Sequence, residues 1–380
     1  MGGLRNGPCE KPDTEKMSIP VTRLICVTSI NQLVVALACL AHNRKDGQVY
    51  NDYLIVNNTE VSNNASNMIM GVGARIHNFK KIIDFRVHLA ELKRSLKNAG
   101  ILRLVFSNPD IISNMAERLR EEINNNPVSE IYLRYKINLP EHLVLKTFPT
   151  ANCFCFEDGM KEYMEPVRRN ISFKFAIAGF IYAFKKDSVL RSFLLQHKYN
   201  NRIASRFSVI FNDERHVNIK KHYANVLDKI ALSTKISDAY PGDYILLVLV
   251  NYSERLSANA EVDDEMVFYR KLIGKMKELY PDKKLMVKAH PNTSPELRSR
   301  YSMLFGESLI DNIQDVPCEV LIALPNVNRV IGAMSSSLLY AKECFGKSSF
   351  LVVPYFIKDF TKWQSVKETL TRYGVQEIVL

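Results

Sequence analysis

Short apolar runs alternate with amphipathic helical stretches along most of the chain. The run VTRLICVTS at 21–29 is rich in β-branched residues and predicts a strand, and a helical pattern at 31–42 follows it directly. The same patterns predict strands at 52–56, 101–106, 130–135 and 151–156, with helices at 79–99 and 108–124. This alternation is typical of an α/β domain with a doubly wound parallel sheet.

A second alternating unit follows the polar stretch STKISDAYPG at 233–242, where a Pro-Gly pair indicates a turn. Before it, residues 165–225 have a mainly helical and basic pattern. After it come predicted strands at 244–250, 284–288, 327–331 and 349–353, and predicted helices at 264–279, 295–304, 317–323, 335–345 and 361–373. Two such units predict two doubly wound domains that face each other across a cleft.

The domain organisation follows from these patterns. We expect a flexible tail at 1–18, an N-terminal domain at 19–235, a C-terminal domain at 236–355, and a final helical segment at 356–380 that crosses back to the N-terminal domain. The chain has 380 residues, 47% of them apolar, which is enough for two separate cores.

Lys and Arg outnumber Asp and Glu by 51 to 40, a net charge of +11. This excess suits an anionic substrate, an anionic membrane surface or nucleic acid. The basic residues are dispersed in doublets such as Lys80-Lys81, and no DNA- or RNA-binding motif is present, which argues against nucleic acid. No apolar run approaches the length of a membrane span and no signal peptide is visible, so we expect a cytoplasmic protein, with peripheral association at an anionic membrane left open.

The seven cysteines are scattered and do not form a disulfide framework. Cys153 and Cys155 have neither a second pair nor a histidine at ligand spacing. We therefore expect them to be buried in a strand rather than to bind a metal.

The first position with chemical potential is Glu157-Asp158-Gly159, directly after the strand at 151–156. An acid at a strand end, followed by a glycine that lets the backbone approach a ligand, can remove a proton from an attacking hydroxyl. The same residues are also common in solvated turns, which is the plainer interpretation.

The second position is His290-Pro291, after a strand that ends at Lys288. Lys288 and His290 supply cationic donors, and a helix capped by Ser294 with Pro295 at its first position follows. A phosphate can bind there, although a surface histidine ahead of a helix cap explains the pattern equally well.

The third position is the run Ser335-Ser336-Ser337, after the strand at 327–331. Hydroxyls and amides at a strand-to-helix junction can hold an anion at the helix N-terminus. Serine is also a favoured N-cap, so capping alone is the alternative.

Other chemistries find less support. A hydrolase triad of Ser336, His290 and Asp158 would lack the Gly-x-Ser-x-Gly pattern of a nucleophile elbow. No glycine-rich nucleotide fingerprint follows the first strand, and no Asp-x-Asp motif suggests a bound cation.

Taken in order, the segments FEDGMKEY at 156–163, KAHPN at 288–292 and SSSLLY at 335–340 resemble motifs of the bacterial GT-B-fold sialyltransferases, which include the polysialyltransferases that build capsules. The segment VPCEVLIALPNVNRVIGAMSSSLLYA at 316–341 resembles the family stretch that leads to the paired serines. The earlier part of the chain matches only in its α/β layout.

The resemblance implies a GT-B fold and an inverting, metal-independent transfer of sialic acid from CMP-sialic acid to a glycan or glycolipid acceptor, in a capsule or a lipooligosaccharide. Glu157 or Asp158 would be the general base; Asp158 is favoured because relatives often have Asp-Asp-Gly. His290 would donate a proton to the phosphate of the CMP leaving group.

The resemblance also implies the donor site. Ser336 and Ser337 would bind the phosphate, with Ser335 a weaker candidate, and Glu319 would recognise the cytosine amine. Three further residues, Gly159, Lys288 and Pro291, complete the expected donor-binding set, with no cofactor and no metal.

Two residues depart from the family pattern: Met160 stands where many relatives have Ser or Thr, and Ala289 in KAHPN is a small variant. Two alternative functions stay open. One is a GT-B transferase of another activated donor such as CDP-glycerol, and the other is a non-catalytic relative that binds glycans or nucleotides.

Overall fold

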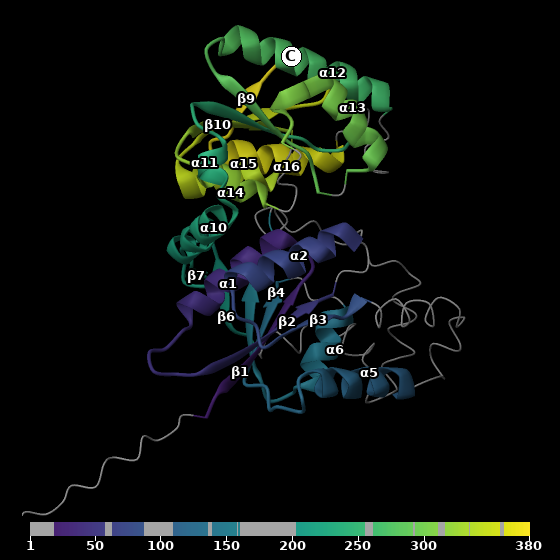
Figure 1. Cartoon of the computed structure of the whole chain (residues 1–380), viewed down its shortest axis with the longest axis vertical. Coiled ribbons are helices and arrows are strands. Elements are labelled where there is room, and N and C mark those ends of the chain that lie inside the picture. The colour runs from purple at the N-terminus through teal and green to yellow at the C-terminus, as the bar shows by residue number, and fades with distance from the viewer. Residues whose placement is uncertain are drawn as a thin grey trace, which may run out of the picture.

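The computed structural model describes residues 19–57, 63–86, 109–135, 139–157, 159, 203–254, 261–291, 293–310, 316–333, 335–357 and 361–380. The tail expected at 1–18, the strand predicted at 101–106, Asp158 and residues 165–202 lie outside this part of the chain. The described residues form two α/β domains stacked along the long axis of the molecule (Figure 1).

The first domain contains a parallel sheet of seven strands in the order β3-β2-β1-β4-β5-β6-β7. Its elements are β1 (Val21–Val27), α1 (Ile30–His42), β2 (Tyr50–Val56), α2 (Asn63–Ile76), β3 (Lys81–Asp84), α5 (Pro109–Glu122), β4 (Glu130–Arg134), α6 (Leu139–Thr147), β5 (Asn152–Phe156), β6 (Ile203–Ser208) and β7 (Val217–Asn218). The strand order reverses between β1 and β4.

Helices cover both faces of this sheet. In β1, Leu24 and Cys26 are buried with residues of α5 and α6, whereas Ile25 and Val27 are buried with residues of α1. Because successive strand residues point to opposite faces, a nearly continuous apolar run such as β1 indicates a strand covered on both sides. The predicted doubly wound arrangement is therefore confirmed for this domain.

Two helices connect the domains, α10 (Lys220–Thr234) and α11 (Ile236–Ala239). Lys235 between them has a φ of 51°, in the left-handed region, and its backbone N–H bonds back to α10. The polar stretch at 233–242 is thus largely helical rather than an extended linker.

The second domain contains a parallel sheet of five strands in the order β12-β11-β10-β8-β9. Its elements are β8 (Tyr244–Val248), α12 (Val262–Leu279), β9 (Lys284–Lys288), α13 (Pro295–Phe305), a 3-10 turn (Gly306–Ser308), α14 (Cys318–Ala323), β10 (Val327–Gly332), α15 (Ser336–Phe345), β11 (Ser348–Val352), α16 (Thr361–Arg372) and β12 (Gln376–Ile378). The strand order reverses between β8 and β10, where ligands bind in open sheets of this kind.

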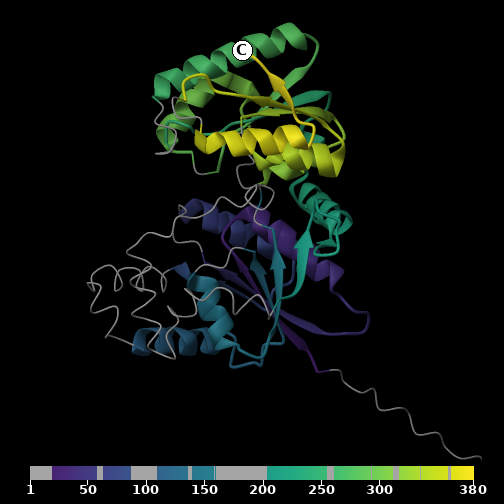
Figure 2. The ribbon, with the colours of Figure 1, turned by 180° about the vertical axis from the view of Figure 1, so that it is seen from behind.

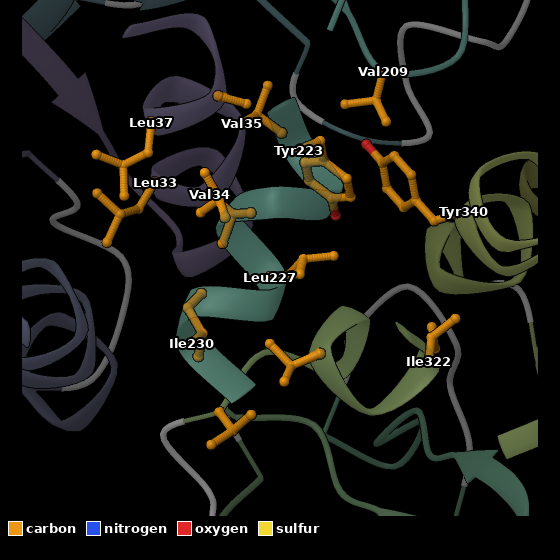
Figure 3. Close-up of a cluster of buried hydrophobic side chains, with 14 of the residues drawn as sticks. Leu33, Val34, Val35, Leu37, Val209, Tyr223, Leu227, Ile230, Ile322 and Tyr340 are labelled. Carbon is orange, nitrogen blue, oxygen red and sulfur yellow. The ribbon is translucent and has the colours of Figure 1, made fainter. Parts of the chain in front are cut away.

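One hydrophobic core extends through both domains. Buried side chains of α1 and α10 continue into those of α14 and α15 without a break (Figure 3). The rings of Tyr223 on α10 and Tyr340 on α15 stack with centroids 5.6 Å apart. The two domains therefore pack against each other beside α10.

Two sequence predictions are corrected by the structure. Residues 81–84, predicted as part of a helix, form the edge strand β3 beside β2. The Ile82-Ile83 pair suits a sheet edge. The basic residues around this pair produce a helical pattern in the sequence, which explains the wrong prediction. Within the stretch predicted as mainly helical, residues 203–208 and 217–218 are strands. Helices α2 and α6 were not predicted.

The chain end also differs from expectation. Its last strand, β12, does not cross back to the first domain but pairs in parallel with β11 at the edge of the second sheet. Of the segment at 356–380, α16 lies on the side of the second domain that faces the first, as the view from behind shows (Figure 2). None of the helices in the described part of the chain combines the length and the apolar content needed to cross a bilayer.

Candidate active site

The acidic motif and the serine motif meet at the domain boundary. Glu157 follows β5 of the first domain, and Tyr340 lies on α15 of the second, four residues after Ser336. The Tyr340 hydroxyl donates a hydrogen bond of 2.7 Å to Oε1 of Glu157. Residues that are far apart in the sequence are thus brought to one place.

Glu157 is 1% exposed and accepts further hydrogen bonds from its own domain. Its Oε2 accepts from the hydroxyl of Ser208 at 2.6 Å and from the backbone N–H of Val209 at 3.0 Å. A buried carboxylate requires such donors, since burying it unpaired is costly. This set of bonds fixes the end of β5 against β6 and against α15.

Gly159 lies directly against the serine motif. Its φ of 84° is in the left-handed region, and a Cβ at this position would lie 3.7 Å from the hydroxyl oxygen of Ser336. Glycine is favoured by the backbone conformation, and its lack of a side chain leaves space beside Ser336. Asp158, the other member of the acidic pair, is outside the described residues.

The three serines have different roles at the start of α15. Ser335 is the N-cap, and its side chain accepts from the backbone N–H of Ser337 at 3.2 Å, which confirms the capping interpretation for this residue. Ser336 is half-buried. Ser337 is buried and donates from its hydroxyl to Oε1 of Glu319 at 3.1 Å. The structure thus brings Glu319 and the serine motif together.

Glu319 is the second residue of the short helix α14, at the same edge of the sheet, and is 6% exposed. Burial raises the pKa of its carboxyl group, and hydrogen bonds that include the one from Ser337 oppose this effect. Burial also raises the pKa of the neighbouring Cys318 thiol; Glu319 adds to that shift, whereas the buried Lys288 ammonium opposes it. Lys288 therefore contributes positive charge near the Cys318 thiol.

The His-Pro turn follows β9. The carbonyl of His290 accepts from the backbone N–H of Thr293 at 3.0 Å and from its hydroxyl at 2.7 Å. Ser294 caps α13 and Pro295 is its first residue, as the sequence predicted. Strand β8 separates β9 from β10, so His290 and the serines follow strands about 10 Å apart, twice the usual strand spacing.

Sequence reasoning missed the loop that follows β8, between these two positions. Its Tyr252 donates from its hydroxyl to the carbonyl of Ala333, just before the serine motif, at 3.2 Å. The fully buried Glu265 accepts from the backbone N–H groups of Tyr252 at 3.1 Å and Ser253 at 2.8 Å. The rule that ligands bind beyond strand ends, applied to the run at 244–250, would have pointed to this loop.

One cavity lies away from the carboxyl edge of the second sheet. A cavity of about 470 Å³, with Lys277, Lys283 and Lys284 among its lining residues, lies at the opposite end of β8 and β9. In the part of the chain that the structure describes, no group of three or more His, Cys, Asp or Glu side chains is arranged to hold a metal ion. Cys153 and Cys155 are buried in β5, as predicted.

Comparison with known protein families gives one match. The model of the alpha-2,8-polysialyltransferase family matches residues 23–354. No curated protein sequence matches the chain significantly.

Solved structures that are similar to this chain have low sequence identity to it. The GT-B domain of a sialyltransferase from Photobacterium damselae has a TM-score of 0.50 and 10% identity, over 94% of this chain and all (100%) of that one. A 2,6-sialyltransferase from a Photobacterium species, in complex with CMP and lactose, gives 0.47 and 10% identity over 94% and 78% of the two chains. UDP-GlcNAc 2-epimerase from Methanocaldococcus jannaschii gives 0.45 and 13% identity over 93% and 91%. The first of these comparisons shows the GT-B fold.

Proposed function

The chain belongs to the alpha-2,8-polysialyltransferase family, and from this we propose that it transfers sialic acid from CMP-sialic acid to a hydroxyl of a glycan that itself ends in sialic acid. The observation that carries the proposal is the contact between the acidic motif of one domain and the serine motif of the other, at the hydrogen bond of 2.7 Å between Tyr340 and Glu157. A transferase needs a base for the acceptor and anion donors for the leaving group at adjoining positions.

The proposed reaction is a single in-line displacement with inversion. One carboxylate of the Glu157-Asp158 pair removes the proton from the acceptor hydroxyl as its oxygen attacks the anomeric carbon of sialic acid. The bond from that carbon to the phosphate oxygen of CMP breaks through an oxocarbenium-like state. His290 donates a proton to the departing phosphate.

The donor is held at the carboxyl edge of the second sheet. Hydroxyls of Ser336 and Ser337 and the N-terminus of α15 bind the CMP phosphate, with Lys288 adding positive charge. Glu319 accepts a hydrogen bond from the cytosine amine. Its position beside Ser337, at 3.1 Å, supports a nucleotide that reaches from the serine motif to α14.

No step of this mechanism needs a metal ion, which we propose as a property of the enzyme. Transfer measured in excess EDTA tests it. The expected rate equals the rate without chelator, and a loss restored by added Mg²⁺ or Mn²⁺ would contradict it.

The donor is tested by ligand-induced thermal stabilisation with CMP, CDP, UDP and GDP. Ligand that binds only the folded state raises the melting temperature, and at about 100 times Kd it adds about 2.7 kcal/mol. We expect the cytidine nucleotides to stabilise the protein selectively. Selective stabilisation by UDP would contradict a CMP-linked donor, and transfer from CDP-glycerol in place of CMP-sialic acid would indicate the other activated donor.

The general base is identified by two separate variants, Glu157→Gln and Asp158→Asn. The loss of a general base lowers kcat by about 100-fold or more and leaves CMP affinity unchanged. This pattern in Asp158→Asn identifies Asp158 as the base, whereas in Glu157→Gln it has a second cause, because Glu157 also bonds Tyr340 of the other domain. If both retain wild-type kcat, the acidic pair has no part in proton transfer.

The net charge of +11 suits an anionic donor and an anionic acceptor, and it also suits peripheral contact with an anionic membrane. Co-sedimentation with liposomes tests the membrane contact. We expect binding to liposomes that contain anionic lipid and none to neutral ones; equal binding to both would contradict an electrostatic contact.

A further inference from the structure

The loop at 250–254 lies at the carboxyl end of β8, between the His-Pro turn and the serine motif. It is held on both sides, because Tyr252 donates to the carbonyl of Ala333 at 3.2 Å while Glu254 accepts from the backbone N–H of Ser294 at 3.0 Å. The buried hydroxyl of Tyr269 also bonds both the N–H and the carbonyl of Val250. The loop is therefore fixed at the carboxyl edge of the second sheet, beside the point where the strand order reverses and where ligands bind in open sheets.

Asn251 in this loop is 6% exposed, and its two side-chain polar atoms differ in what they bind. Nδ2 donates to Oε2 of Glu254 at 2.7 Å. Oδ1 is buried and has no hydrogen-bond partner among the residues that the structure describes. Exchanging the two atoms would put a carbonyl oxygen against the Glu254 carboxylate, so this carboxylate fixes Oδ1 as the unpaired atom.

A buried acceptor without a donor costs folding free energy, and such groups are rare in native proteins. At the edge of a binding crevice, a ligand can supply the missing donor. We propose that Oδ1 of Asn251 accepts a hydrogen bond from a hydroxyl or the acetamido N–H of the sialyl group of the donor, and so takes part in recognising the transferred sugar. This inference rests on the proposed function.

The chemistry of the neighbouring residues indicates that Asn251 lies near the sugar of the donor and not near its nucleotide. A carbonyl oxygen accepts hydrogen bonds and does not bind an ionised phosphate, which belongs with Ser336 and the N-terminus of α15. Glu319, beside Ser337, takes the cytosine. The sugar then lies on the other side of the phosphate, toward the ends of β8 and β9, where Asn251 and His290 are placed.

The test compares binding of CMP with binding of a slowly transferred donor, CMP-3-fluorosialic acid, by calorimetry. For Asn251→Ala we expect donor-analogue affinity to fall about tenfold, which corresponds to about 1.4 kcal/mol, with CMP affinity within about twofold of wild type. A matched control is Ser349→Ala, because the Ser349 hydroxyl is also buried without a partner among the described residues of this domain but lies near the amino end of β11. It should change neither affinity.

Unchanged affinity of Asn251→Ala for the donor analogue would overturn the inference. Equal losses for CMP and for the analogue would also overturn it, since they would show a role in the nucleotide site or in the shape of the whole crevice. Failure of the proposed function gives a different result, in which the wild-type protein itself binds CMP-3-fluorosialic acid no better than CMP and transfers no sialic acid.

Discussion

Tyr340→Phe tests whether the bond between the domains has the strength that its geometry suggests. The ring of Tyr340 is fully buried and stacks on Tyr223, and both properties are retained by phenylalanine. The change therefore removes only the hydroxyl that donates to Oε1 of Glu157 at 2.7 Å. A hydrogen bond to a charged group contributes about 1.5–3 kcal/mol, so we expect the free energy of unfolding to fall by that amount.

Urea unfolding followed by fluorescence measures this change, because the chain has 1 tryptophan, Trp363 on α16. The control is Tyr301→Phe, which removes a hydroxyl that donates to the buried Glu265 at 2.6 Å inside the second domain. Both variants should lose comparable stability. A change under about 0.5 kcal/mol for Tyr340→Phe, with the control near about 2 kcal/mol, would refute the reasoning that this bond stabilises the described domain arrangement.

Activity separates the two variants. Tyr340→Phe loosens the acidic motif relative to the serine motif, and a misplacement of about 1 Å can cost about 100-fold in rate, so we expect kcat to fall while CMP affinity is retained. Tyr301→Phe should change kcat less. Equal kcat values for the two variants would show that the contact does not position the reacting groups.

Three further predictions concern buried charges. Because burial raises the pKa of Glu319, CMP binding should weaken on acidification at a pH where an ordinary glutamate is still ionised. Titration calorimetry should show that the CMP affinity of Glu319→Gln lacks this pH dependence. Identical pH profiles of CMP affinity for wild type and Glu319→Gln would contradict the role in cytosine binding. Asp52→Asn should lower stability by about 3–5 kcal/mol at pH 7, because the buried Arg23 loses its partner at 2.6 Å. Burial disfavours the Asp52 carboxylate, but hydrogen bonds from His77 and Arg23 outweigh burial and lower the pKa of Asp52. The stabilisation by Asp52 is therefore present above about pH 4 and is lost as the pH falls further. Urea midpoints of wild type and Asp52→Asn that differ by the same amount at pH 7 and at pH 3 would contradict this prediction. Glu265→Gln should lower the free energy of unfolding by about 1.5–3 kcal/mol and should lower kcat, because the substitution frees the loop after β8. Unchanged stability would show that the hydrogen bonds of Glu265 do not hold that loop.

The sequence predicted the central strands well because they are buried on both faces. In β8, Ile245 and Leu246 are both buried although they point to opposite sides, and such a run differs clearly from an amphipathic helix. The edge strands β3 and β12 were misassigned or missed, since they are short and their residues carry no strong pattern. Their place in the sheets depends on pairing with β2 and β11, which a local pattern does not show.

The candidate site divides in the same way. The strand-end rule and the family motifs identified His290 and the serines, whose positions depend on local strand-to-helix junctions. The contact of Tyr340 with Glu157 joins residues 183 positions apart, and no local pattern marks it. Asn251 was missed because a single asparagine after a strand matches no motif, and only its burial and its unpaired oxygen distinguish it.

Sialyl transfer measured by mass spectrometry tests the central claim most directly. The protein is incubated with CMP-sialic acid and a short oligosaccharide that ends in sialic acid, and CMP release is followed in parallel. The account predicts products heavier by whole sialyl residues, with CMP released in equal amount, and a loss of about 100-fold or more for His290→Ala with CMP binding retained. A folded wild-type protein that binds CMP but forms neither product nor free CMP from this donor would contradict it.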